Sequence, residues 1–137
     1  MKTSFFHLIW MAGLLLSQFV IASDHSDILD KYSKLALLEN PTFTGFSSQR
    51  GQNIFYEATG GKPSTPNCTS CHGKDSTKPG KARTGKTIKP MASSVNPSRY
   101  TDIKKTEKWF RRNCKSVLGR TCTAQEKGDF ITYMLNQ

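Results

Sequence analysis

Apolar side chains recur at helical spacing in two segments of the N-terminal half of the chain. The first segment is residues 27–38, and its apolar positions are Ile28, Leu29, Tyr32, Leu35, Ala36 and Leu38. We expect the helix to stop before Pro41, because proline lacks the N–H that a helix interior requires. The second segment is residues 48–58, with Gly60-Gly61 expected to end it. Its inward positions are Ile54 and Phe55.

Helical spacing returns in the C-terminal third. Thr101 or Asp102 can cap a helix there. Its stripe is Ile103, Thr106, Phe110 and Asn113, with Trp109 beside it. Thr123-Ala124-Gln125-Glu126 reads as a capping box that opens a last helix, which runs to Leu135. The inner side of this last helix is Phe130, Tyr133 and Met134.

Residues 73–97 between these helical parts are rich in Lys, Thr, Ser, Gly and Pro. Only Ile88, Met91 and Val95 contribute much apolar area there, so this segment predicts a wrapping loop rather than a core element. No convincing strand pattern is present. The predicted fold class is therefore all-α.

Residues 1–22 have the pattern of a secretory signal peptide. Lys2 is followed by an apolar stretch over residues 5–21, and Val20-Ile21-Ala22 forms a small-residue cleavage site. An uncleaved membrane anchor is the alternative, since the stretch is near the lower length limit for crossing a bilayer. Cleavage would leave a single domain over residues 23–137, which is small for building a core of its own.

The formal net charge of +10 falls to +9 when Lys2 is removed with the leader. Such an excess often indicates an anionic partner, although a basic surface can also serve solubility alone. Nucleic acid is not expected for an exported protein. Acidic protein surfaces, including those of redox partners, and anionic lipids are the remaining candidates.

Cys68-Thr69-Ser70-Cys71-His72 carries the most specific chemistry in the chain. A Cys-x-x-Cys-His motif supplies two thiols for thioether bonds to haem c and a histidine as proximal iron ligand. The alternatives are a zinc half-site and a redox dithiol. Zinc would require a second Cys or His pair, and a thioredoxin-like dithiol would require flanking strands. Attachment of such a haem in bacteria follows export, so we expect a periplasmic protein.

Cys114 and Cys122 remain after the haem motif. In an oxidising compartment they are a natural disulfide pair, and two free thiols are the alternative. Met91, which follows Pro90 in the loop, is the obvious candidate for a sixth ligand, because a soft thioether holds both oxidation states of iron. Met91 can equally pack in the core.

Over residues 48–137 the chain resembles the sphaeroides haem protein family of small periplasmic c-type cytochromes. The landmarks, in order, are Gly60-Gly61-Lys62-Pro63, Cys68-Thr69-Ser70-Cys71-His72-Gly73, Arg83-Thr84-Gly85-Lys86, Asn96-Pro97-Ser98-Arg99-Tyr100-Thr101-Asp102, Glu107-Lys108-Trp109-Phe110-Arg111-Arg112-Asn113-Cys114 and Gly119-Arg120-Thr121-Cys122-Thr123. The resemblance implies a small cytochrome c-type fold, with helices and loops wrapped around one covalently bound haem.

The resemblance also implies site residues. An asparagine at the position of Asn113 ligates ferric haem opposite His72 and leaves on reduction, so that ferrous haem binds oxygen or another diatomic ligand. Cys114 and Cys122 form the family's disulfide beside it. A leucine is usual in the family where this chain has Met91. From the residues alone, Asn113 would instead end its helix in a left-handed conformation that asparagine tolerates.

The expected function is electron transfer combined with ligand binding at the opened haem. The resemblance implies a diheme cytochrome c or a membrane b-type cytochrome as redox partner. One alternative is an ordinary His–Met electron carrier that uses Met91. Another is a minor reductase or oxygenase activity at the opened haem, although the chain shows no evident distal His–Arg pair for general acid catalysis.

Overall fold

The computed structural model describes residues 25–137, so the predicted leader lies outside the described residues. The elements are α1 (His25–Glu39), α2 (Ser48–Glu57), α3 (Thr69–His72), β1 (Gly80–Lys81), β2 (Thr87–Ile88), α4 (Ile103–Val117) and α5 (Ala124–Leu135). The mainly helical content confirms the all-α prediction. Within this part of the chain no helix is long and apolar enough to span a membrane.

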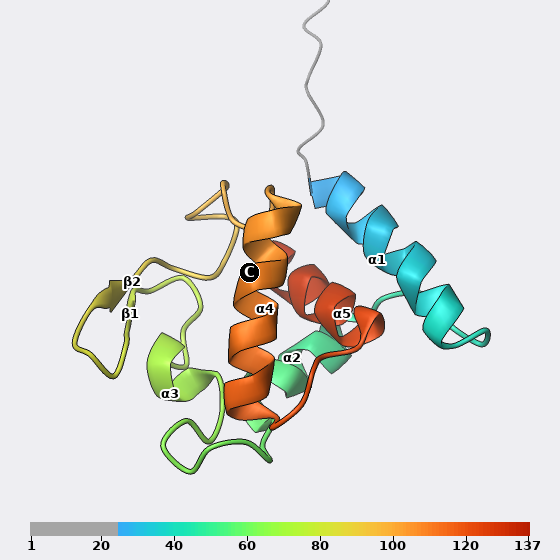
Figure 1. Cartoon of the computed structure of the whole chain (residues 1–137). Coiled ribbons are helices and arrows are strands. Elements are labelled where there is room, and N and C mark those ends of the chain that lie inside the picture. The colour runs from blue at the N-terminus through green and yellow to red at the C-terminus, as the bar shows by residue number, and fades with distance from the viewer. Residues whose placement is uncertain (1–24) are drawn as a thin grey trace, which may run out of the picture.

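The core lies where α2 and α1 pack against α5. Tyr32 of α1, Phe55 of α2 and Met134 of α5 are almost fully buried, as the helical spacing of apolar residues predicts. Ile131 of α5 is also fully buried, although it is not among the inner positions predicted for that helix. Phe110 reaches this core from α4, with its ring centroid 5.7 Å from that of Phe130. Figure 1 shows α4 in front, between the α1 side of the molecule and the side that carries α3 and the two short strands.

The helix starts follow from local capping chemistry. The Asp102 carboxylate accepts a hydrogen bond from the Lys105 N–H (2.9 Å), so Asp102 rather than Thr101 caps α4. Thr123 and Glu126 form the predicted capping box at the start of α5. Each of these bonds satisfies a backbone N–H that the first helical turn leaves unpaired.

The segment 73–97 contains structure that its composition does not predict. β1 and β2 pair antiparallel, Gly80 with Ile88 and Lys81 with Thr87. The Ala82 and Lys86 backbones close the turn between them. Two-residue strands in a polar segment are too short to show the alternation of apolar and polar residues from which strands are predicted.

A buried carboxylate ties α5 to the start of α2. Asp129 is 1% exposed, and its carboxylate accepts hydrogen bonds from the Ser47 N–H (2.6 Å) and from the Arg50 guanidinium (2.6 and 2.9 Å). A buried charge is stable only when it is paired in this way. The network therefore fixes how the two principal core helices meet.

We expect Asp129→Asn to lower the free energy of unfolding by about 2–3 kcal/mol, because the Arg50 charge and the Ser47 N–H lose an ionic acceptor in a buried position. Urea denaturation of the full protein measures the change. Asp30→Asn is the matched control, since its ion pair with Lys34 is exposed to solvent and contributes little to stability. Equal losses in the two variants would contradict the prediction.

Candidate haem-binding site

One short helical turn gathers the residues of the Cys-x-x-Cys-His motif. Cys68 has helical backbone angles and caps α3, and its carbonyl accepts hydrogen bonds from the N–H groups of Cys71 and His72 (3.3 and 3.1 Å). Gly73 ends the turn with a φ of 73°. Residues at positions i, i+3 and i+4 of a helix share one face, so the two thiols and the imidazole are presented together.

The short strand β1 lies directly behind this turn. A Cβ atom on Gly80 would overlap the Cys71 carbonyl and the Cα of His72. The hairpin therefore packs directly against the backbone of the motif, and only glycine fits at position 80. This contact holds α3 in place from the side of the loop.

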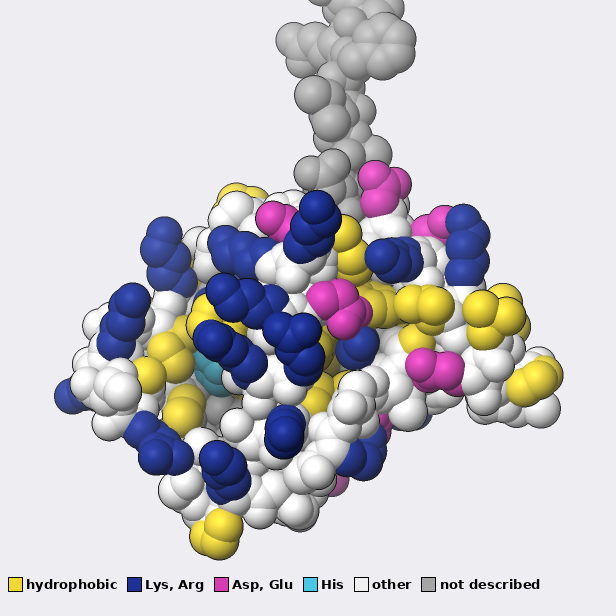
Figure 2. Space-filling view, in the orientation of Figure 1, with side chains coloured by type: hydrophobic (Ala, Val, Ile, Leu, Met, Phe, Trp, Pro, Cys, Tyr) yellow, Lys and Arg dark blue, Asp and Glu magenta, His cyan; other side chains and the backbone are white. Residues whose placement is uncertain are grey.

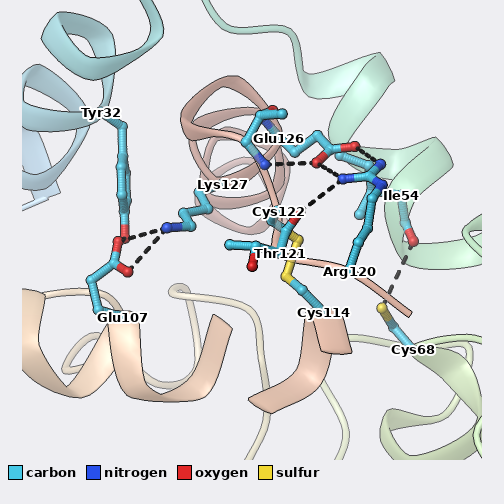
Figure 3. Close-up of a disulfide and its surroundings, with 11 residues drawn as sticks. Tyr32, Ile54, Cys68, Glu107, Cys114, Arg120, Thr121, Cys122, Glu126 and Lys127 are labelled. Atoms are coloured by element: carbon cyan, nitrogen blue, oxygen red, sulfur yellow. Dashed lines mark hydrogen bonds and ion pairs between the residues drawn. A yellow bond between two sulfur atoms is a disulfide. The ribbon is translucent and has the colours of Figure 1, made fainter. Parts of the chain in front are cut away.

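The electrostatics of the motif suit ligation of a metal by nitrogen. Burial, with a smaller contribution from the Arg99 guanidinium, lowers the pKa of His72 to about 4. The imidazole is therefore neutral at physiological pH and keeps a lone pair for coordination. Burial raises the pKa of the Cys68 thiol to about 11, so that this thiol stays protonated. Its sulfur lies 3.7 Å from the Ile54 carbonyl oxygen (Figure 3).

Arg99 and Tyr100 organise the end of the long loop. The Arg99 guanidinium donates to the carbonyls of Lys89 and Pro90 (2.6 and 3.0 Å). Tyr100 is buried with a left-handed φ of 60° and donates its hydroxyl hydrogen bond to the Met91 carbonyl (3.1 Å). A non-glycine residue in this conformation costs about 1–2 kcal/mol, which the surrounding contacts must offset.

The two candidates for the sixth ligand differ in their surroundings. The Met91 side chain is 7% exposed and belongs to the hydrophobic core. Asn113 is exposed, and its side-chain amide makes no hydrogen bond within residues 25–137. The protein thus encloses the thioether and leaves the amide free.

The helix-end explanation of Asn113 is wrong. α4 continues to Val117, four residues beyond Asn113, and Tyr100 is the only non-glycine residue with positive φ in the described part. Asn113 is an interior helical residue on the edge of the buried stripe formed by Thr106, Cys114 and Val117. A left-handed conformation therefore does not account for asparagine at this position.

The C-terminal end of α4 is anchored on two sides. The Gly61 and Lys62 N–H groups donate to the carbonyls of Val117 and Ser116 (2.8 and 2.7 Å), and the Thr65 hydroxyl also donates to Ser116 (3.1 Å). A Cβ on Gly61 would overlap the Ser116 carbonyl. These bonds satisfy carbonyls that a helix end leaves unpaired.

A disulfide is the second anchor. Cys114 and Cys122 are joined, with their Cα atoms 5.7 Å apart. Figure 3 shows this bond linking α4 to the segment before α5, beside the ion pair of Arg120 with Glu126 (2.6 Å). Asn113 therefore immediately precedes a residue whose position is fixed covalently.

The residues present fit a haem better than zinc. Cys68 and Cys71 are free thiols, His72 is a neutral nitrogen donor, and no cluster of three or more His, Cys, Asp or Glu residues suited to a metal ion occurs within residues 25–137. Figure 2 shows hydrophobic side chains and a histidine in a hollow beside α4, with Lys and Arg side chains around it. A flat apolar cofactor requires such a lining.

The sequence motif identifies Cys68, Cys71 and His72 as haem-binding residues but assigns no role to the residues that support them. Gly80, Gly61 and Thr65 act through close backbone contacts and hydrogen bonds, which single-residue patterns do not reveal. Arg99 was visible only as one of the family landmarks.

Comparisons with known proteins identify c-type cytochromes as relatives of this chain. Residues 41–134 match a family described as "Domain of unknown function (DUF1924)". The cytochrome c-type protein SHP of Cereibacter sphaeroides is 50% identical over 91 residues, which cover 66% of this chain and 70% of the relative. Cytochrome c'' of Methylophilus methylotrophus is 34% identical over 131 residues, or 91% of this chain and 90% of the relative.

The solved structures that are similar to this chain are also c-type cytochromes. Oxidised SHP, described as an oxygen-binding cytochrome c, superposes with a TM-score of 0.76 at 41% identity, covering 84% of this chain and 98% of that one. The oxidised crystal structure of Methylophilus methylotrophus cytochrome c'' has a TM-score of 0.72 at 35% identity, covering 83% and 94%. A solution structure of the same cytochrome, described as concerning haem-ligand detachment, has a TM-score of 0.71 at 35% identity, with the same coverage. The chain belongs to the sphaeroides haem protein family of c-type cytochromes.

Proposed function

We propose that this chain is a periplasmic monohaem cytochrome that exchanges electrons and carries a releasable distal ligand. Cys68 and Cys71 would hold the haem through thioether bonds, and His72 would be the proximal iron ligand. This assignment is supported by the two free thiols and the neutral imidazole on one helical turn. When bound, the haem supplies a one-electron redox centre and an iron with a sixth position.

Asn113 is the distal ligand that best fits the described residues. The observation that carries this choice is its exposed amide without a hydrogen-bond partner, in the interior of α4 rather than at its end. An amide oxygen is a hard, neutral and weak donor, which binds ferric iron better than the softer ferrous iron. Reduction would therefore weaken its hold, and Asn113 would leave the position to oxygen or another diatomic molecule.

The surroundings of Asn113 limit how far it can move. The disulfide at Cys114 and the bonds from the Gly61 segment hold the last turn of α4. Departure of the amide would then be a local change at Asn113, with the helix kept in place. The relatives support the proposal, since one is described as oxygen-binding and another is studied for detachment of a haem ligand.

An ordinary His–Met electron carrier is the second candidate. Met91 would have to turn its thioether out of the core, where it is 7% exposed, although its backbone is held by Ser76 and Tyr100. A reductase or oxygenase activity has weaker support. His25, the other histidine of the described part, is hydrogen-bonded to the Arg99 backbone carbonyl near the start of α1.

The proposal extends to partners and location. The resemblance indicates a diheme cytochrome c or a membrane b-type cytochrome as electron donor. The strongly basic composition suits an acidic protein partner. Nucleic acid is not expected as a partner, because the protein is proposed to be exported.

Periplasmic maturation is tested on the protein purified from a bacterial periplasm. We expect intact-mass analysis to show a chain that begins at Ser23 and carries the mass of one haem, which persists after denaturation because thioethers are covalent. Cys68→Ala with Cys71→Ala should abolish the retained mass. Loss of haem from the denatured wild-type chain would contradict covalent attachment. Recovery of a chain that still carries residues 1–22 would contradict cleavage of the leader.

Replacing the distal ligand tests the proposed function directly. We expect Asn113→Ala to convert the ferric absorption spectrum from low-spin to high-spin or water-ligated, while the ferrous form still binds carbon monoxide. Asn96→Ala is the matched control, because that amide donates to the Pro90 carbonyl in the loop (2.9 Å). A low-spin ferric spectrum that survives Asn113→Ala would exclude Asn113 as the ligand.

Met91→Leu separates the two candidates. Because leucine and methionine have similar volumes, we expect a stability change below about 1.5 kcal/mol and unchanged ferric and ferrous spectra. Absorption spectroscopy and urea denaturation measure both effects. Loss of the ferric low-spin spectrum in this variant would favour the His–Met carrier.

A further inference from the structure

The outward face of α4 carries an unusual concentration of positive charge. Its basic side chains, all exposed, are Lys104, Lys105, Lys108, Arg111, Arg112 and Lys115. Glu107 is the only acidic residue of this helix, and it is bound to Tyr32 and Lys127 instead. Figure 2 shows the dark blue side chains gathered over α4.

These charges form a continuous stripe. Lys104, Lys108, Arg111 and Lys115 follow one another at intervals of four, three and four residues, which places them on one helix face over about 17 Å. None of them is in an ion pair within residues 25–137. Like charges at these spacings repel and destabilise a helix. An anionic partner would remove this repulsion.

The stripe lies on the helix that presents Asn113. The disulfide and the Gly61 segment anchor the end of that helix, so a partner would meet a rigid surface and lose little entropy in ordering it. A protein docked there would be separated from the side of Asn113 by one helix, about 10 Å in diameter.

We propose that the outward face of α4, defined by Lys104, Lys108, Arg111 and Lys115, is the docking surface for an acidic electron-donor protein. The inference rests on the proposed redox function and adds the location of the contact. The step is a one-electron exchange, in which the donor protein is oxidised by one electron and this chain is reduced by one, without transfer of any atom.

An acidic protein fits this face better than an anionic membrane. A helix that lies in a membrane interface buries an apolar face among the lipids. The apolar side of α4 is already used, since Cys114 and Val117 are buried and Phe110 packs on Phe130 within the protein. Trp109 is the one large apolar side chain that α4 exposes, and Arg112 lies over its ring. What α4 leaves to a partner is therefore mainly charge.

The test uses the haem-loaded protein and flavodoxin, an acidic flavoprotein, as the probe. Reduction by photoreduced flavodoxin is followed at increasing ionic strength, and binding of oxidised flavodoxin is measured by calorimetry at low salt. The variant is K104Q/K108Q/R111Q/K115Q. The matched control is K74Q/K78Q/K81Q/K86Q, which also removes four charges, from exposed residues of the loop after the haem motif.

We expect the α4 variant to react about tenfold more slowly than wild type at low salt, to lose most of the salt dependence and to bind flavodoxin more weakly. The loop variant should stay within about threefold of wild type. Glutamine is a good helix former, so the α4 variant should keep its spectra. Reduction by free lumiflavin semiquinone, which is small and uncharged, should be equal in all three proteins.

Three outcomes would overturn the proposal. The loop variant could be the slower one, or both variants could react as wild type does. Alternatively, the α4 face could bind phosphatidylglycerol vesicles while flavodoxin reduction is unaffected. The calorimetric measurement of binding does not depend on ligand release at the haem. If the assignment of Asn113 is wrong, the carbon monoxide spectra will show it, and the docking result can still be interpreted.

Discussion

The arrangement of the site depends on how the last turn of α4 is held. Backbone hydrogen bonds from Gly61 and Lys62 join that turn to the segment that leads into Cys68, and the disulfide from Cys114 joins it to the start of α5. One anchor thus ties α4 to the side of the haem motif and the other ties it to the core helices. The position of Asn113 follows from both.

This anchoring gives the proposed switch a physical basis. A weak amide donor can leave a metal only if it has somewhere to go, and it can return only if its helix has stayed in place. The Asn113 side chain is exposed, and the next residue, Cys114, is held in place by the disulfide. Met91 has the opposite situation, since core side chains enclose it and its carbonyl is bound to Tyr100. The geometry therefore favours Asn113 as a ligand that can be exchanged, and it favours a Met91 side chain that stays in the core.

Much of the fold could be predicted from the sequence, because helical spacing and capping residues act locally. Asp102, Thr123 and Glu126 begin helices where their chemistry predicts. The motif likewise identifies His72. The close approach of Gly80 to Cys71 and the hydrogen bond of Arg99 to Pro90 could not be predicted, because they depend on the path of the loops that bring these residues together. Asn113 became a candidate through family resemblance alone, since its helical position resembles that of any polar residue.

The most direct test is a pair of absorption spectra of the wild-type protein, ferric and ferrous, each with and without carbon monoxide. A ligand that leaves on reduction predicts a six-coordinate low-spin ferric form and a five-coordinate high-spin ferrous form that binds carbon monoxide. A ferrous form that remains six-coordinate and low-spin, and does not bind carbon monoxide, would contradict the account.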